Sequence, residues 1–252
     1  MHVHVFQHLP YEGLGALSGW LEERGAFVTR TCFWEADATQ NPPPPSDWLV
    51  VLGGSMGAYE EDRYPWLVTE KQWIREALQV GRRVLGICLG AQLLADVLGG
   101  KVFPHSMQEP GWIPVQRTAE ASDHPLLAGV PDTLNVFHWH GDTFTLPPGA
   151  SQLWRSAFCE QQAFVWNDQA LGLQCHPEIT PEMIADWTRL AKNDWVPSDS
   201  MASREALLDA ARNESACAAL KNPFARLMEN WMALSSTTLF LQGGHSPVSP
   251  VQ

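Results

Sequence analysis

The thiol of Cys88 is the side chain of this sequence best placed for nucleophilic chemistry. It follows a short apolar stretch at residues 84–87 and precedes a helical stretch at residues 89–97 that ends at a glycine pair. A strand that turns directly into a helix needs a tight backbone, and Gly86 and Gly90 remove the side chains that would obstruct the turn. Free amides at the start of the helix would stabilise a thiolate and an adjacent oxyanion. The sequence therefore predicts a nucleophilic cysteine, with a buried structural cysteine as the alternative.

A base and an orienting group for this thiol occur late in the chain. His176 and Glu178 lie two residues apart at the end of an extended stretch, and Pro177 between them favours extended backbone. Such side chains point to the same side, so the carboxylate can hold one imidazole nitrogen while the other faces the thiol. Cys88, His176 and Glu178 are therefore the predicted catalytic residues, as nucleophile, base and orienting group. A strand-end turn without a catalytic role is the alternative for residues 175–178.

The elements that would position these residues alternate between strand and helix. Strand-like stretches occur at residues 3–8, 26–33, 48–52 and 84–87, and helical stretches at residues 13–24, 65–81 and 89–97. The alternation predicts an α/β fold with a mostly parallel central sheet flanked by helices. In such a sheet the carboxyl ends of the strands form one crevice, which would bring a glycine loop at residues 53–57 next to Cys88 and His176.

The second half of the chain has a different pattern. Short strand-like stretches follow closely at residues 101–103, 113–116, 134–139, 152–156, 162–166 and 171–174, with turns expected at residues 109–112 and 140–142. They predict a small antiparallel region. C-terminal helices are expected from Thr180, at residues 203–219 and at residues 223–234. The predicted organisation is one domain over residues 1–193, a helical C-terminal extension over 194–235 packed on that domain, and a loosely held tail over 236–252.

Composition argues against several classes of function. The 252 residues carry a net charge of −12, which disfavours nucleic acid or an anionic membrane as a partner. No apolar run is long enough to span a bilayer, and the N-terminus lacks the features of a signal peptide. The five cysteines follow no disulfide framework, so we expect a reduced, cytoplasmic protein. The glycine loop lacks the ending of a phosphate-binding loop and the spacing of the dinucleotide motif, and no cofactor is predicted.

Three motifs and their order resemble a known family. Gly-Gly-Ser-Met-Gly at residues 53–57, Gly-Ile-Cys-Leu-Gly-Ala-Gln at residues 86–92 and Gln-Cys-His-Pro-Glu at residues 174–178 resemble the class I, or triad, glutamine amidotransferases. The resemblance covers roughly residues 3–187. Further marks resemble the stand-alone GMP-synthase-like members: residues 52–56, 65–67, 99–102, 109–112, 138–142 and 162–164. The resemblance implies a flavodoxin-like sheet and an amidotransferase domain over residues 1–193.

The resemblance also implies a reaction and a role for each site residue. Cys88 would attack the γ-carboxamide of glutamine, His176 would take the thiol proton and later protonate the departing ammonia, and Glu178 would orient His176. The N–H groups of Gly54 and Leu89 would form the oxyanion hole. The residues expected to contact the substrate are Gln92, Trp139, His140, Gly141 and Asp142. Hydrolysis of the thioester would release glutamate, and transfer of the ammonia would need a separate synthetase subunit.

Two positions depart from the family's pattern. Ser55 stands where the glycine loop often has proline, which would let the loop flip and leave the oxyanion hole unformed. Trp139 stands where glutaminases usually carry a small polar residue, and hydrolysis of γ-glutamyl peptides or γ-glutamyl amines by the same triad is the alternative function.

Two other classes of function are rival hypotheses. A metal-dependent hydrolase would use His138, His140, Cys175 and His176, but the last two point to opposite faces of an extended chain, and no metal site is predicted. A non-enzymatic regulatory protein is disfavoured because the Cys-His-Glu set is intact.

Overall fold

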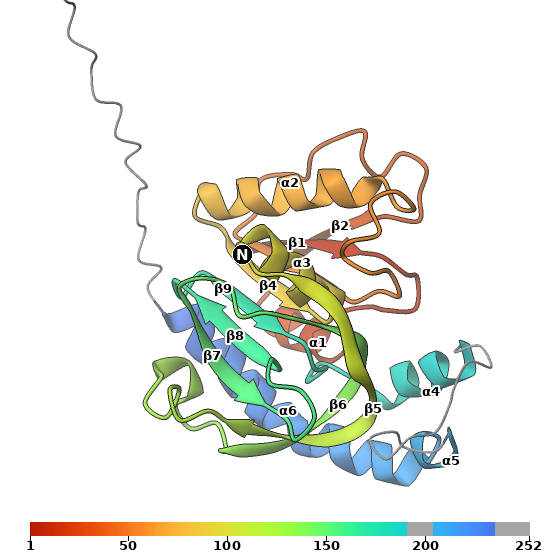
Figure 1. The fold of residues 1–252 in the computed structure, drawn as a ribbon, viewed down its shortest axis with the longest axis vertical. Helices are drawn as coiled ribbons and strands as arrows, with labels where there is room; N and C mark the ends of the chain where they lie inside the picture. The colour runs from red at the N-terminus through yellow and green to blue at the C-terminus, as the bar shows by residue number, and fades with distance from the viewer. Residues whose placement is uncertain (191–203, 235–252) are drawn as a thin grey trace, which may run out of the picture.

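The computed structural model describes residues 1–190 and 204–234, and a mixed sheet lies at its centre (Figure 1). The sheet has nine strands in the order β2-β1-β3-β4-β9-β8-β7-β5-β6. Helices cover both of its faces, so the predicted α/β class is confirmed.

Five strands form the parallel half of the sheet: β1 (His2–Gln7), β2 (Phe27–Cys32), β3 (Trp48–Val51), β4 (Arg83–Ile87) and β9 (Ala170–Leu173). Each pairs in parallel with its neighbour in this group. Their carboxyl ends therefore lie at one edge of the sheet. The segments that follow β1, β3, β4 and β9 meet there, as expected for the crevice of an α/β sheet.

The antiparallel half consists of β5 (Val102–Arg117), β6 (Thr133–Phe144), β7 (Ala150–Arg155) and β8 (Ala163–Trp166). It is larger than the sequence predicts, and the two expected turns are wrong. Residues 109–112 lie inside β5 and residues 140–142 lie inside β6. The two strands pair over nearly their whole length, with one shift of register between Pro104 and Glu109. This cross-strand pairing overrides the local turn signals of proline and glycine.

The helices form a layer on each face of the sheet. One face carries α1 (Ala16–Glu22), α4 (Pro181–Leu190) and α6 (Ala210–Ala233), and the other carries α2 (Trp66–Gln79) and α3 (Leu89–Val97). A short 3₁₀ turn, η1 (Pro125–Leu127), contacts α6. In β3, Val50 packs on the first face, whereas Leu49 and Val51 pack on the second. A strand covered on both sides is apolar throughout, which explains the continuous apolar run in the sequence.

The C-terminal helices differ from the prediction. The short helix α5 (Arg204–Leu207) is followed by a single helix α6, which runs through Pro223 where two helices were expected. A proline removes one helical hydrogen bond, but Leu220 and Phe224 beside it are buried in the core, so packing holds the helix together. The proposed boundary at residues 193 and 194 and the tail at 236–252 lie outside the described residues. Within the described part of the chain, no helix is long and apolar enough to cross a membrane.

Candidate active site

Cys88 occupies a strained turn between β4 and α3. Its φ of 53° lies in the left-handed region that non-glycine residues rarely adopt. A Cβ on Gly90 would lie 1.9 Å from the Val51 carbonyl oxygen, and a Cβ on Gly86 would lie 2.4 Å from the Gly90 oxygen. The Cys88 amide donates a hydrogen bond to the Leu173 carbonyl (2.7 Å), which ties the turn to β9. The turn therefore has the geometry of a nucleophile elbow, and both glycines are sterically required.

The side chains of His176 and Glu178 contact each other directly. His176 Nδ1 donates a hydrogen bond to Glu178 Oε1 over 2.8 Å, and both side chains are buried. The His176 amide donates to the Phe137 carbonyl (2.8 Å), which joins this segment to β6. Burial disfavours the imidazolium, but the charges of Glu178 and of a Cys88 thiolate outweigh it and raise the pKa of His176 well above 6.5. An imidazolium beside a thiolate is the reactive state of a cysteine nucleophile.

The Cys88 thiol differs from the other cysteines in its surroundings. It lines the pocket at the carboxyl edge of the sheet, with Sγ 3.8 Å from the Trp139 carbonyl oxygen. Burial raises the pKa of the Cys159 thiol, and it raises that of Cys175 well above 9. Burial likewise raises the pKa of Cys32, and it raises that of Cys217 to about 11. These four thiols are therefore neutral at ordinary pH, which leaves Cys88 as the candidate nucleophile.

The amides of Gly54 and Leu89 lie on the loop after β3 and at the start of α3. Neither amide donates a hydrogen bond to another residue of the described ranges. His8 Nδ1 donates to the Gly53 carbonyl oxygen over 2.8 Å. Because the carbonyl and the N–H of a trans peptide point in opposite directions, this contact turns the Gly54 N–H away from His8. The glycine loop thus has one anchored peptide even though Ser55 replaces proline.

His8 is itself held firmly, by contacts that the sequence does not indicate. Its ring stacks between Phe33 and Trp66, with centroids 5.4 and 5.5 Å away, and its Nε2 lies 2.9 Å from Glu70 Oε1. Burial lowers the pKa of His8, but the charge of Glu70 outweighs it and the net shift is upward. The partners come from β2, α2 and their neighbouring loops, so no local pattern could have predicted them.

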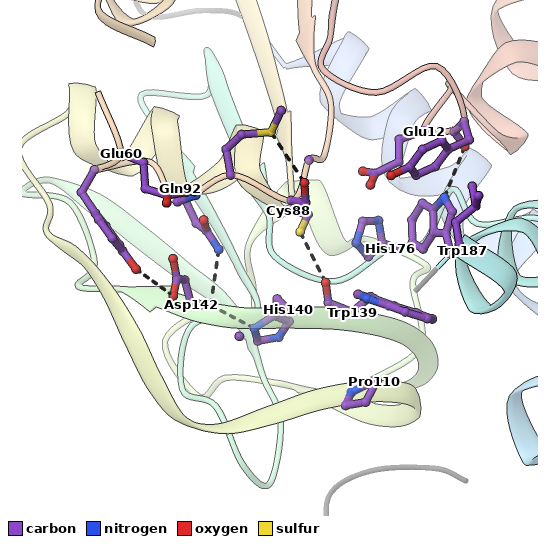
Figure 2. Close-up of a pocket in the computed structure, with 18 of the residues that line it drawn as sticks. Glu12, Glu60, Cys88, Gln92, Pro110, Trp139, His140, Asp142, His176 and Trp187 are labelled. Atoms are coloured by element: carbon purple, nitrogen blue, oxygen red, sulfur yellow. Dashed lines mark hydrogen bonds between the residues drawn. The ribbon is translucent and has the colours of Figure 1, made fainter. Parts of the chain in front are cut away.

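A pocket of about 880 Å³ opens at this edge of the sheet. All five residues predicted to contact the substrate line it: Gln92, Trp139, His140, Gly141 and Asp142. Figure 2 shows Cys88 between two groups of lining side chains: Glu60, Gln92 and Asp142 on one side, and Glu12, His176 and Trp187 on the other. The pocket therefore has two halves that meet at the thiol.

The half with Asp142 is polar and carries both signs of charge. Gln92 Nε2 donates to the Asp142 carbonyl oxygen (3.3 Å), and Tyr59 donates its hydroxyl to Asp142 Oδ1 (3.4 Å). Glu60 and Arg63 line the same half and form an ion pair of 3.3 Å. Burial, together with the charge of Glu60, raises the pKa of Asp142. Sequence reasoning missed Tyr59, Glu60 and Arg63, although a charged and aromatic run directly after the glycine loop was a usable signal.

The opposite half of the pocket also contains residues that the sequence analysis did not identify. Tyr11 and Glu12 come from the loop between β1 and α1, and Trp187 comes from α4. The indole of Trp187 lies edge-on to the His176 ring, with 4.9 Å between centroids. Nothing in the local sequence links residues 12 and 187, which only the fold brings together.

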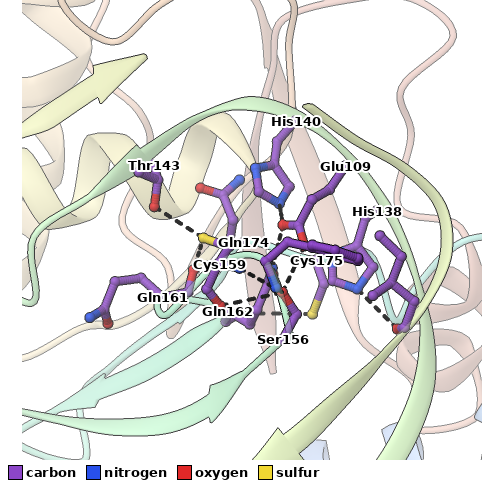
Figure 3. Close-up of polar contacts among 12 residues, drawn as sticks. Glu109, His138, His140, Thr143, Ser156, Cys159, Gln161, Gln162, Gln174 and Cys175 are labelled. Atoms are coloured by element: carbon purple, nitrogen blue, oxygen red, sulfur yellow. Dashed lines mark hydrogen bonds and ion pairs between the residues drawn. The ribbon is translucent and has the colours of Figure 1, made fainter. Parts of the chain in front are cut away.

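A buried polar cluster lies behind His140 (Figure 3). Glu109 Oε2 lies 2.9 Å from His140 Nε2, and Glu109 also accepts hydrogen bonds from Ser156 (2.7 Å) and Gln162 (2.8 Å). Burial opposes ionisation of this carboxyl, but its contacts, above all with His140, lower the pKa of Glu109 to about 2. The contact between Glu109 and His140 fastens β5 to β6 where β6 lines the pocket.

The four residues of the metal-dependent alternative do not converge. Within the described residues, the group that could hold an ion is Glu109, His138 and His140, whose ligand atoms lie within 4.8 Å of one another. Cys175 Sγ instead contacts the Gln162 carbonyl oxygen (3.7 Å), and His176 is engaged by Glu178. His138, His140, Cys175 and His176 therefore do not surround one common metal position.

The sequence is similar to known amidotransferases. The family model described as "Glutamine amidotransferase class-I" matches residues 24–186. The glutamine amidotransferase-like protein YfeJ of Salmonella typhimurium is 34% identical over 187 residues, which cover 73% of this chain and 78% of that protein. A GMP synthase of Thermomicrobium roseum is 42% identical over 132 residues, which cover 52% of this chain and 23% of the synthase. The chain thus matches about a quarter of the synthase.

Solved structures show the same fold. A glutamine amidotransferase from Thermotoga maritima superposes with a TM-score of 0.81 and 33% identity, covering 93% of this chain and 99% of that chain. A glutamine amidotransferase from Methylobacillus flagellatus gives a TM-score of 0.82 at 27% identity, covering 98% of both chains. With its cysteine elbow, its His-x-Glu pair and these relatives, the chain belongs to the class I glutamine amidotransferase family.

Proposed function

We propose that this protein hydrolyses the γ-carboxamide of glutamine through a thioester on Cys88. The observation that carries the proposal is the left-handed turn at Cys88, which holds the thiol at the pocket beside the buried His176–Glu178 pair. Membership of the family supports glutamine as substrate. In this proposal Cys88 is the nucleophile, His176 the general base and acid, and Glu178 the orienting group.

The reaction would proceed in two acyl-transfer steps. The Cys88 thiolate attacks the amide carbon, and the N–H groups of Gly54 and Leu89 stabilise the resulting oxyanion. The C–N bond then breaks as His176 gives its proton to the departing ammonia, and the thioester remains. His176 next takes a proton from a water molecule that attacks the thioester. The C–S bond breaks, glutamate leaves, and the thiol is restored.

The polar half of the pocket suits the amino acid end of this substrate. The carboxylates of Glu60 and Asp142 would face the α-ammonium, and the Arg63 guanidinium would face the α-carboxylate. Gln92 would hold the substrate through its side-chain amide, one helical turn beyond the nucleophile.

Hydrolysis of γ-glutamyl amines or peptides is the second candidate, and one observation favours it. The pocket continues past Cys88 into the half lined by Glu12, Trp139 and Trp187. The ammonia that leaves from glutamine is too small to occupy this half, whereas a substituted amine would extend into it.

The proposal extends to a synthetase as partner and to the cytoplasm as the compartment. If the ammonia is used for synthesis, its acceptor would be bound by a synthetase that works with this domain, because a GMP synthase is 42% identical to the chain over 132 residues. The five free cysteines are in keeping with a reducing cytoplasm.

The test is ammonia release from glutamine by the purified protein, alone and after treatment with a diazoketone analogue of glutamine. We expect the analogue to modify Cys88 and Cys88→Ala to lower kcat by about 10⁴-fold or more. Cys217→Ala is the matched control, since Cys217 lies outside the pocket, and it should change kcat by less than about twofold. Turnover that survives Cys88→Ala, or a label on another cysteine, would refute the mechanism.

A further inference from the structure

The half of the pocket beyond the nucleophile contains a carboxylate that the reaction does not use. A Cβ placed on Gly53 would lie 2.6 Å from Glu12 Oε2, 3.5 Å from Cys88 Cβ and 3.5 Å from His176 Cε1. The Glu12 carboxylate, the thiol-bearing residue and the imidazole therefore border the same small space. Figure 2 shows the Glu12 carboxylate directed toward Cys88 and His176.

The loop that carries Glu12 is fixed on both sides of this residue. Before it, the Tyr11 carbonyl accepts a hydrogen bond from Trp187 Nε1 (3.3 Å). After it, the Ala16 amide donates to the Glu178 carbonyl (2.7 Å). Gly15 has a φ of 51°, and a Cβ there would lie 2.1 Å from the same oxygen, so the position requires glycine. The loop that carries Glu12 is thus hydrogen-bonded to α4 through Trp187 and to the backbone of Glu178.

The Glu12 carboxylate makes no direct contact with a donor or a cation among the described residues. Over residues 1–190 and 204–234, no group forms a hydrogen bond or an ion pair with this carboxylate. Burial raises its pKa, as does the charge of Glu178, while His176 and His8 act in the opposite direction. A partly buried carboxylate without a direct partner is unfavourable, and a cationic ligand would supply the contact that the described residues do not.

Aromatic rings surround the same space. Tyr11, Trp139 and Trp187 line the pocket with Glu12, and the two indoles meet edge to face with 6.0 Å between centroids. Aromatic faces next to a carboxylate attract organic ammonium groups through the ring quadrupole. Among the described residues that line the pocket, the one basic side chain of the Lys or Arg type is Arg63, which lies in the other half with Glu60. This side therefore favours a positive charge.

We propose that this half of the pocket, defined by Glu12, Tyr11, Trp139 and Trp187, binds the cationic end of an amine joined to the γ-carboxyl of glutamate. The proposal rests on the Cys88 thioester mechanism proposed above and narrows its second candidate substrate class to γ-glutamyl amides of diamines or polyamines. The Cys88 thiolate forms the C–S bond, the C–N bond breaks, and His176 protonates the departing amine nitrogen. Glu12 contacts the far ammonium of the leaving group, and water then releases glutamate.

The experiment compares two substrates of equal length in the full chain. γ-Glutamylputrescine ends in an ammonium group, and γ-glutamylpentylamide ends in a methyl group at the same position. We expect the intact protein to prefer the first by about tenfold or more in kcat/KM, and Glu12→Gln to reduce this preference at least about tenfold. Glu60→Gln, in the opposite half, is the matched control, because it should affect both substrates by the same factor.

The outcomes separate this proposal from the one on which it rests. Equal kcat/KM values for the two amides, or an equal loss for both in Glu12→Gln, would overturn the cation site and show that Glu12 positions His176 instead. Cys88-dependent hydrolysis of glutamine with no preference for the cationic amide would leave the proposed function standing and refute this inference. Absence of Cys88-dependent turnover of glutamine and of both amides would refute both. Binding of γ-glutamylputrescine to Cys88→Ala, measured by calorimetry with and without Glu12→Gln, gives the same comparison without turnover.

Discussion

The contact between His176 and Glu178 makes the protonation of the imidazole depend on one carboxylate. Burial alone would drive the proton off this ring, and Glu178 is the strongest influence that keeps it there. The imidazolium therefore persists above pH 6.5. The contribution of this pair to the free energy of unfolding is complete below pH 6.5. It is lost as the pH rises through the raised pKa of His176.

We expect Glu178→Gln to lower the pKa of His176 and to reduce kcat by about 10²–10⁴-fold, because the amide keeps the shape but not the charge. The pKa is read from the imidazole ¹⁵N shifts in a Cys88→Ala background, with and without the substitution. Glu35→Gln, at an exposed position, is the control and should leave the titration where it was. A His176 titration that does not move to lower pH would contradict the assigned role of the carboxylate.

The turn between β4 and α3 depends on glycine, a residue without a side chain. Gly90 packs against the carbonyl of Val51 so closely that a methyl group has no space. The Gly90 amide also donates a hydrogen bond to the Leu52 carbonyl just after β3 (3.1 Å), so the first turn of α3 can approach β3 this closely only without a side chain at residue 90.

Gly90→Ala should therefore destabilise the protein by about 3 kcal/mol or more and move the thiol away from His176. Denaturant unfolding measures the first effect, and the alkylation rate of Cys88 measures the second. Gly19→Ala in α1 is the matched control, since a Cβ there meets nothing within 4 Å and a helical alanine is favoured by about 1 kcal/mol. Equal stability of the two variants would show that the turn has room to adjust.

The whole molecule is held together by a core that continues into α6. Trp231 is fully buried and its ring contacts Trp48 of β3, with 4.8 Å between centroids. Arg83, at the start of β4, donates hydrogen bonds to the carbonyls of Trp231 (2.6 Å) and Leu234. These contacts predict that α6 unfolds together with the sheet and does not form an independent unit.

Trp231→Ala should accordingly lower the free energy of unfolding of the whole chain by about 3–5 kcal/mol. Denaturation followed by circular dichroism and by the reactivity of Cys88 should give one coincident transition. Met232→Ala is the control on the next position of the helix, where the side chain is 43% exposed and a change within about 0.5 kcal/mol is expected. An earlier transition that leaves Cys88 protected would identify the C-terminal helices as a separate domain.

Local sequence is sufficient to predict the parts of the site whose geometry depends on neighbouring residues. Gly86 and Gly90 flank Cys88 within two positions. His176 and Glu178 do contact each other as their spacing of two suggests, but residues 177 and 178 form a turn and not the expected extended segment. The apolar strands of the parallel half were predictable for the same reason, because burial on both faces leaves a continuous local pattern.

Features that depend on pairing between distant segments follow from the tertiary structure and not from local sequence. β5 and β6 continue through their proline and glycine positions because each strand is the partner of the other, and α6 continues through Pro223 because the core packs against both sides of it. The place of Glu12 beside Gly53, Cys88 and His176 is of the same kind. Four segments that are far apart in the chain meet at the carboxyl edge of one sheet, and contacts between such segments leave no periodicity in the sequence.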